Sequence, residues 1–545
     1  MNLASSTRSI EPLPLQVPSL QPRKRRATSY GGANMQSAAD SDPDHPRDPR
    51  LEPDQHMHVY MSAYEAVGPP LLVLITFVGV RLLSYWRSFV FHSDRYRHTD
   101  TVSTQDLHML SLPYLKVQIT TRGSAGSTEV VLRGIRNVQE LGAEDPTFYR
   151  ELLSVELITE SKAQAARVER TFAGHPIAVD AVVLPDGYET PNGTKLKARA
   201  LHFAVERRRA GWNRKPGRTF ILHYDEESVM VPGELRKLLR ALATNPHRIL
   251  EGPIHYPLEY MNTSPLCRAM EANRPIGCFE CRHVMESGIP LHLHGSNLVL
   301  DEDFENDLGW DIGCLDDEPF IAEDYVFGMS AFLSGGTDVF DWHGCVMLEQ
   351  PPLSYRSAFR QRYRWIFGVL QGLTMTRRSP GFATLPRLVR LRLVLGTLYR
   401  IATFALGAVI GIFALGFGPL YLLLAGQSLL DGHHFYLSTW ITLWLTIVGG
   451  LWLGSIFIGG WYNVAEAGLA PLQRIGQLAL VVCLAPIAGI FESCAGLWAL
   501  LAWCGGRRTV EWQPTPKTAV ADANIPGRTR PSQRDRLPEL SDLTH

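Results

Sequence analysis

The sequence predicts an α/β domain between an N-terminal membrane helix and a C-terminal α-helical transmembrane bundle. Between residues 100 and 385, strand-like runs that end in polar residues alternate with amphipathic helical stretches, which is typical of a largely parallel sheet covered by helices. One uncharged stretch precedes this region, and long apolar stretches follow it. The formal net charge of -1 argues against a nucleic-acid-binding protein, which would carry a basic surplus.

Residues 1–60 are rich in Pro, Ser, Arg and Asp, so we expect a disordered tail. A helix is predicted over 61–95, where the uncharged stretch AVGPPLLVLITFVGV (66–80) is short for a membrane span. It reaches the roughly 20 residues that a span requires if the helix continues and the Arg81 guanidinium snorkels to the headgroups. The alternative is an interfacial helix.

Three strands are predicted in the region 100–385, and each ends in polar residues: YLKVQITTRG (114–123), LLSVELITE (152–160) and RTFILHYDEES (218–228). Helical stretches such as GELRKLLRALA (233–243) lie between or after them. In such sheets ligands bind beyond the C-terminal ends of the strands. We therefore expect a site at the ends of these strands.

The membrane region is predicted over 390–505, and 506–545 is expected to be a disordered cytoplasmic tail. Its apolar stretches are 401–426, 436–461 and 476–504. The last is interrupted by Pro486 and Glu492, so it is a span, a tight hairpin, or a span plus an interfacial helix.

Several arginines lie in 377–400, whereas 427–435 has no Lys or Arg. The positive-inside rule therefore puts the α/β domain in the cytoplasm.

The cysteines do not form the framework of a secreted protein, because three of the eight lie in apolar C-terminal segments. Cys278-Phe-Glu-Cys281, with Cys267 and His283 nearby, is a candidate zinc knuckle. No second CxxC follows, and buried thiols are the simpler interpretation.

Two acidic clusters are candidates for chemistry. Asp225 and Glu227 follow an apolar run and would point to the same side of an extended chain, where they can hold a hard divalent ion on a diphosphate. A solvated turn is the simpler interpretation of these residues. Glu323 and Asp324 would begin a helix, either as an acidic pair favoured by the helix dipole or as a carboxylate base.

A basic and aromatic cluster, QRYRW (361–365), precedes the membrane region. On a helix, Gln361, Arg364 and Trp365 lie on one face, which suits a diphosphate and a sugar ring. A lipid-facing basic patch is the alternative. Upstream, Asn-Gly marks a turn before the helix KLKARALHFAVE, so Lys197 near its start can reach a phosphate, unless it is a surface lysine.

The order of these motifs along the chain resembles that of the membrane-bound glycosyltransferase family 2 enzymes, such as cellulose, chitin and hyaluronan synthases. The motifs are TRG, KARAL, DEE, AED and QRYRW, and membrane spans follow them. TTRG, HYDEES, EGPIHYP, LHGSNLV, IAEDYVFGM and RQRYRWIFGVLQG are most similar to the egghead-type β-1,4-mannosyltransferases. The resemblance covers about residues 110–375 and the flanking spans.

The resemblance implies an A-type, Rossmann-like glycosyltransferase domain with Mg²⁺ or Mn²⁺. It implies a catalytic base at Asp324 with Glu323 as its neighbour, and metal ligands at Asp225 and Glu227. It implies further residues that bind the donor or clamp the diphosphate and acceptor: Thr121, Arg122, Glu160, Lys197 and Asp225 for the donor, and Gln361, Arg364 and Trp365 for the clamp. The polysaccharide synthases generally show DxD where this chain has DEE, which leaves open whether Glu226 or Glu227 is the second acidic partner.

The function expected from this resemblance is an inverting transfer of mannose from GDP-mannose, in β linkage, to a glycolipid or saccharide acceptor. The alternative is a processive polysaccharide synthase that uses a UDP-sugar, and a third hypothesis is an inactive membrane scaffold. We expect a multi-pass protein of the plasma membrane, in contact with membrane lipids and without a nucleic-acid partner.

Overall fold

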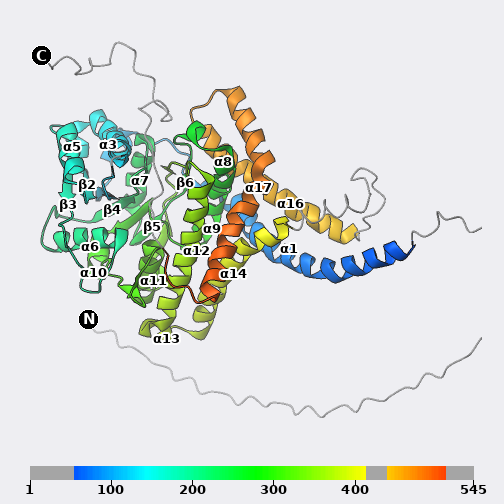
Figure 1. The fold of residues 1–545 in the computed structure, drawn as a ribbon. Coiled ribbons are helices and arrows are strands. Elements are labelled where there is room, and N and C mark those ends of the chain that lie inside the picture. The colour runs from blue at the N-terminus through cyan, green and yellow to red at the C-terminus, as the bar shows by residue number, and fades with distance from the viewer. Residues whose placement is uncertain (1–53, 125, 413–438, 511–545) are drawn as a thin grey trace, which may run out of the picture. The chain divides into compact units, whose positions relative to one another are not determined.

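The computed structural model describes residues 54–124, 126–412 and 439–510. Most of the expected tails and the 427–435 loop lie outside the described residues. From Glu65 onward the described chain forms one compact unit (Figure 1).

A seven-stranded mixed sheet forms the centre of the α/β region, in the order β10-β5-β7-β4-β1-β2-β3. Its strands are β1 (Tyr114–Thr121), β2 (Leu153–Thr159), β3 (Ala178–Val183), β4 (Thr219–Tyr224), β5 (Ile249–Glu251), β7 (Leu298–Asp301) and β10 (Phe340–Trp342). The strand β7 is antiparallel to both of its neighbours, β4 and β5, and the other pairs are parallel. The three strands predicted from the sequence are β1, β2 and β4, and they lie side by side in this sheet.

Two shorter sheets complete the strands, β6 (Ile254–His255) with β11 (Met347–Leu348) and β8 (Cys314–Leu315) with β9 (Glu318–Pro319). The helices before the membrane region are α1 (Asp54–Tyr96), α2 (Thr104–His108), α3 (Ser127–Glu144), α4 (Pro146–Arg150), α5 (Lys162–Phe172), α6 (Leu196–Arg209), α7 (Pro232–Thr244), α8 (Pro265–Glu271), α9 (Arg274–Glu286), α10 (Glu302–Leu308), α11 (Glu323–Gly335), α12 (Tyr355–Arg378) and α13 (Pro380–Thr384). Single 3₁₀ turns lie at Tyr260–Asn262 and Thr337–Val339.

Helices cover both faces of the sheet, with α3 and α5 on one face and α6 and α10 on the other (Figure 1). Because side chains alternate along a strand, Leu115, Val117 and Ile119 of β1 share one face, where they belong to a core with apolar residues of α3, α5 and α7. Lys116 points to the opposite face and is fully buried, with its ammonium 2.6 Å from Glu302. The buried charge is therefore paired, as burial requires.

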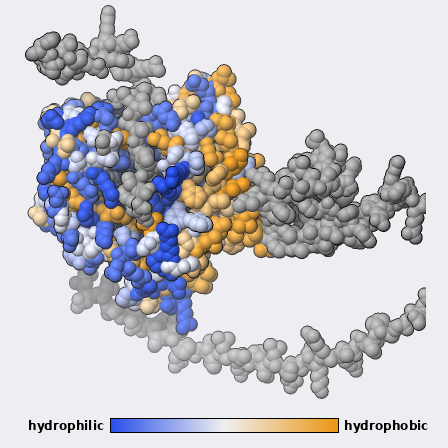
Figure 2. Space-filling model, viewed as in Figure 1, coloured by the Kyte–Doolittle hydropathy of each residue, from blue (hydrophilic) through white to orange (hydrophobic). Residues whose placement is uncertain are grey.

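Among the described residues, four helices have segments long and apolar enough to cross a membrane: Leu72–His92 of α1, Arg387–Ile410 of α14 (Arg387–Ile412), Thr446–Glu466 of α16 (Thr439–Glu466), and α17 (Pro471–Cys504). Figure 2 shows the hydrophobic surface gathered over these helices and a mostly hydrophilic surface over the sheet. The apolar helix expected from 401 begins earlier, at Arg387, and residues 413–426 lie outside the described part of the chain.

The Arg81 side chain, for which snorkelling was considered, is paired within the protein. Its guanidinium lies 2.9 Å from the Glu280 carboxylate of α9 and donates to Thr403 Oγ1 of α14 at 2.8 Å. Arg400 of α14 lies 3.0 Å from the same Glu280 oxygen. One buried acid thus holds an arginine from each of two apolar helices, a pairing that polar residues at membrane depth require.

The segment 476–504 belongs to one continuous helix, α17, with Pro486 inside it, so the hairpin alternative is wrong. Glu492 lies within the same continuous helix and pairs with a cation. Its carboxylate lies 3.2 Å from Arg362 Nε of α12.

Candidate active site

A cavity of about 530 Å³ brings together every residue that the sequence singled out for donor, metal, base or clamp. These residues are Thr121, Arg122, Glu160, Lys197, Asp225, Glu227, Glu323, Asp324, Gln361, Arg364 and Trp365. They are spread over nearly half of the chain, and the fold brings them to the lining of one cavity. Their roles stay predictions, and their proximity is what the structure adds.

One end of the cavity lies at the C-terminal ends of neighbouring parallel strands, as expected for such a sheet. Thr121 ends β1, and its hydroxyl donates to Glu226 Oε2 at 2.8 Å. Glu160 follows β2 and lies 2.8 Å from Arg199 of α6. The expected donor residues therefore carry polar groups at the edge of the sheet.

The argument that placed Asp225 and Glu227 on one side of an extended chain is wrong, because β4 ends at Tyr224 and the chain turns. The Ser228 amide donates to the Asp225 carbonyl at 3.1 Å, and the Asp225 amide donates to Ser228 Oγ at 3.1 Å. All three acids of the DEE run still line the cavity, and Glu227 is buried. The three acids therefore reach the cavity from a turn and not from alternate positions of a strand.

Lys197 reaches this acidic turn from the first turn of α6, which begins after the Asn-Gly turn as predicted. Its ammonium pairs with Asp225 and donates to the Gly295 carbonyl at 2.8 Å. Burial lowers the pKa of Lys197, but the carboxylates of Asp225, Glu323 and Asp324 outweigh it and the net shift is upward. Lys197 is therefore held as a cation among acids.

Glu323 and Asp324 occupy the first turn of α11, so the helix-start interpretation is correct, and both also line the cavity. Burial and the Glu323 charge raise the pKa of Asp324 to about 7, against the opposing effects of its hydrogen bond from the Tyr325 amide and of Lys197. Burial also raises the pKa of Glu323, opposed by Lys197. A carboxyl with a pKa near neutrality is suited to accept a proton during a reaction.

The QRYRW run lies on α12, and its expected face does line the cavity. The indole of Trp365 is contacted by two guanidinium groups, from Arg274 at 4.3 Å and from Arg362 at 4.8 Å to the ring centroid. Arg362 is fully buried and pairs with Glu271 at 2.6 Å. Arg362 also lines the cavity and contacts the clamp while it is paired with Glu271, a role the sequence pattern did not indicate.

Sequence reasoning also missed Arg274 and Glu349, which line the same cavity. Both lie in stretches without a recognisable spacing of polar residues, and their place depends on contacts distant in sequence. The Glu349 carboxylate accepts from Ser228 Oγ at 3.1 Å and from Ser296 Oγ. It adds a further carboxylate beside the DEE turn.

The other end of the cavity reaches the apolar helices. Tyr85 of α1, and Thr397, Ile401 and Phe404 of α14, belong to its lining. The same space therefore extends from the strand ends to helices that are long and apolar enough to cross a membrane.

The donor groups at the strand ends fit a hard divalent cation. Asp225, Glu226 and Glu227 all line the cavity, and carboxylate oxygens are the ligands that Mg²⁺ and Mn²⁺ prefer. The Lys197 ammonium against Asp225 shows that this region already attracts positive charge.

The candidate zinc knuckle is not formed by the residues named for it, and the favoured interpretation, buried thiols, agrees with the structure. Cys267 and Cys278 are buried, whereas His283 is exposed. In the described part of the chain, the His, Cys, Asp or Glu side chains close enough to share a metal with Cys281 are His292 and His294.

Comparison with known proteins identifies the region that holds most of these residues. The model of the family described as glycosyl transferase family group 2 matches residues 220–453. Residues 220–453 thus resemble a family 2 glycosyltransferase domain. The matched part of this domain includes the DEE turn, the start of α11 and the QRYRW helix.

The relatives are β-1,4-mannosyltransferases. The chain is similar to the β-1,4-mannosyltransferase egh of Drosophila melanogaster, with 23% identity over 48% of this chain and 53% of that protein. It is also similar to the β-1,4-mannosyltransferase bre-3 of Caenorhabditis briggsae, with 29% identity over 35% of this chain and 40% of that protein. The chain spans about half the length, or less, of the curated relatives it matches. The resemblance to egghead-type glycosyltransferases is confirmed at this low identity.

Among solved structures, a mannosyltransferase of Pyrobaculum calidifontis, in complex with GDP-Man and Mn²⁺, aligns over 72% of this chain and 99% of its own, with 16% identity and a TM-score of 0.39. The S. aureus TarS 1–349 structure aligns over 72% of this chain and 92% of its own, with 11% identity and a TM-score of 0.31. Likenesses of this degree carry no conclusion about substrate.

Proposed function

We propose that this glycosyltransferase domain transfers mannose from GDP-mannose, in β linkage and with inversion, to a lipid-linked or saccharide acceptor. One observation carries the proposal. A single cavity holds a carboxyl with a pKa near neutrality, an acidic turn paired with a lysine, and the QRYRW face, and it extends to apolar helices.

The donor would lie at the strand ends. Thr121, Arg122 and Glu160 would hold the nucleoside, and the Lys197 ammonium would contact the diphosphate. A divalent ion, Mg²⁺ or Mn²⁺, held by Asp225 and by Glu226 or Glu227, would supply charge neutralisation for the diphosphate leaving group.

Asp324 would act as the general base. It takes the proton of the acceptor hydroxyl as the hydroxyl oxygen attacks the anomeric carbon from the face opposite the diphosphate. The bond from the anomeric carbon to the phosphate oxygen breaks, and its electron pair leaves with the nucleoside diphosphate. Arg364 and Lys197 stabilise the charge on that leaving group. One displacement converts an α-linked donor into a β-glycoside.

Glu323 would have a separate task. Its charge interacts favourably with Lys197 and with Arg364. It therefore supports the two cations that face the diphosphate, and it also raises the basicity of Asp324 by repulsion.

The acceptor would enter from the membrane end of the cavity. Apolar residues of α14 and the aromatic ring of Tyr85 line that end, which suits the chain of a lipid-linked acceptor. The sugar of the acceptor would then lie between Trp365 and Asp324. We further propose that the domain faces the cytoplasm, on the plasma membrane.

The base assignment is tested by Asp324→Asn, which should leave donor affinity nearly unchanged but lower the turnover number by roughly 10²–10⁴-fold. Donor affinity is measured by calorimetry beside initial rates. The control is Asp338→Asn, an exposed acid just beyond α11, which should retain wild-type turnover. If Asp324→Asn keeps more than about a tenth of wild-type turnover, the loss is smaller than removal of a general base typically causes, and Asp324 is not the base.

The substrate assignment is tested by donor competition in purified membranes, with labelled GDP-mannose against a set of UDP-sugars. We expect a mannosylated, β-mannosidase-sensitive product of defined length. A polymer that grows only with a UDP-sugar would instead identify a processive polysaccharide synthase.

A further inference from the structure

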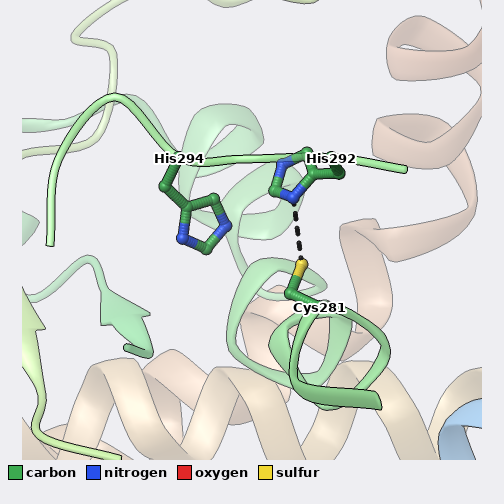
Figure 3. Close-up of side chains that lie close together, drawn as sticks. All are labelled: Cys281, His292 and His294. Carbon is green, nitrogen blue, oxygen red and sulfur yellow. Dashed lines mark hydrogen bonds between the residues drawn. The ribbon is translucent and has the colours of Figure 1, made fainter. Parts of the chain in front are cut away.

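Beside the residues assigned to the transfer reaction, the wall of the same cavity brings one thiol and two imidazoles together. Cys281 lies on α9, and His292 and His294 lie on the loop 289–297 between α9 and β7 (Figure 3). Their ligand atoms all lie within 4.8 Å of one another, and Cys281 Sγ is 3.3 Å from His292 Nδ1. Cys281 and His294 are buried, and His292 is half-buried.

These separations are close to those of a metal site. With a Zn–S bond of about 2.3 Å and a Zn–N bond of about 2.0–2.1 Å, a tetrahedral ion holds its sulfur and nitrogen ligands about 3.6 Å apart. The Cys281–His292 separation is already near that value. The longest separation has to shorten by roughly 1 Å, which side-chain rotation can supply.

The orientation of His294 is also that of a ligand. Its Nδ1 lies 2.9 Å from Glu251 Oε1, and Glu251 is fully buried. Figure 3 shows the other side of the ring turned toward Cys281 and His292. A carboxylate behind a histidine that faces a metal fixes the ring and raises its basicity.

We propose that Cys281, His292 and His294 form a zinc site that fixes the loop 289–297 in the wall of the active-site cavity. One thiolate and two imidazoles are a donor set that suits Zn²⁺ and does not suit Mg²⁺ or Mn²⁺. Glu251 supplies a second negative charge, so the buried ion is nearly neutralised. The site is separate from the acidic turn at Asp225, and the inference does not depend on the proposed transferase activity.

A metal ion at this site would anchor the part of the loop 289–297 that is not already held. Its C-terminal end is already anchored, because Asn297 Nδ2 donates to the carbonyls of Pro253 and Cys345 at 2.8 and 2.9 Å. Its middle carries the Gly295 carbonyl that binds Lys197. An ion on His292 and His294 would anchor the remaining half to α9 and so hold that carbonyl in place.

The site is tested on the full-length protein, purified in detergent with a tag that lacks histidine, in buffers without chelator. Elemental analysis should find about one zinc per chain in the wild type. Cys281→Ser and His292→Ala should each lower the zinc content at least ~10-fold, and Glu251→Gln should weaken zinc affinity by about 10–100-fold. His283→Ala and Cys483→Ser are the controls, because both side chains are exposed, and they should keep the ion.

Reconstitution keeps the test decisive if a variant does not fold. Wild-type protein stripped with a chelator is titrated with Co²⁺, and a thiolate-to-cobalt charge-transfer band is expected that Zn²⁺ abolishes. Wild-type protein without zinc and without this band would overturn the proposal. So would zinc retained in Cys281→Ser, or zinc lost from Cys278→Ser as completely as from Cys281→Ser, which would make Cys278 an essential ligand.

Discussion

Replacement of Arg362 by methionine should destabilise the junction between α12, α8 and α17. The guanidinium is fully buried and lies 2.6 Å from Glu271 and 3.2 Å from Glu492. Removal of one partner from a buried ion pair typically costs about 3–5 kcal/mol, because the remaining charge is left without compensation.

The structure favours the lower end of that range. Glu271 keeps Arg274, which lies 3.8 Å away, so Glu492 is the acid that loses its arginine partner. We therefore expect a loss of about 3 kcal/mol. For a cooperative unit of about 300 residues, this lowers Tm by about 5 °C.

The assay is thermal unfolding of the purified protein in detergent. Arg356→Met is the matched control, because Arg356 is an exposed arginine on the same helix, and its effect should stay within about 0.5 kcal/mol. Addition of Glu492→Gln to Arg362→Met should restore part of the loss, because the amide carries no charge. If Arg362→Met and Arg356→Met lower Tm equally, the buried pair does not stabilise the junction.

Three further outcomes follow from the site. The logarithm of kcat/KM should fall with unit slope below pH 7, where Asp324 becomes protonated. Glu323→Gln should move this acidic limb of the profile to lower pH, because it removes a negative charge that raises the pKa of Asp324. An unmoved limb would mean that another group titrates. Activity should be lost in enzyme stripped with EDTA and return with Mg²⁺ or Mn²⁺, whereas full turnover without a divalent ion would contradict a metal role for Asp225. Because we expect the domain to be cytoplasmic, Ser334→Cys, at an exposed position near the end of α11, should not increase labelling of intact cells by an impermeant thiol reagent above that of the native cysteines. Labelling should increase after permeabilisation. Increased labelling of intact cells would show that the domain faces the opposite side of the membrane.

The sequence predicted the parts of the fold that local patterns encode. The strands β1, β2 and β4 are apolar runs of the right length, and α6 and α7 carry turn and proline signals at their starts. The strand β7 could not be placed in the same way. It enters the sheet between β4 and β5 in the opposite direction, and its four residues carry no mark of direction.

The residues of the candidate site that the sequence predicted are also those that stand in local patterns. Asp324 and the QRYRW face were found because they stand in short motifs, and Lys197 because it follows a turn. Arg362 and Arg274 were not found, because each depends on partners far away along the chain. Cys281 was singled out, but its neighbours His292 and His294 were missed because they lie on a loop without a recognisable ligand spacing. Arg362 and Glu492 are separated by 130 residues, and no local periodicity links them.

The pairing of Glu280 with Arg81 and Arg400 bears on how the protein is made. An arginine at the centre of a membrane helix costs about 2.5–3.5 kcal/mol on insertion when it has no partner. Two such helices, α1 and α14, depend for compensation on one carboxylate that belongs to a helix of the α/β region and is translated between them. If α1 and α14 span a bilayer, their arginines gain this compensation only once α9 has folded. A chain whose α/β region misfolds would then leave both arginines uncompensated and available to membrane quality control.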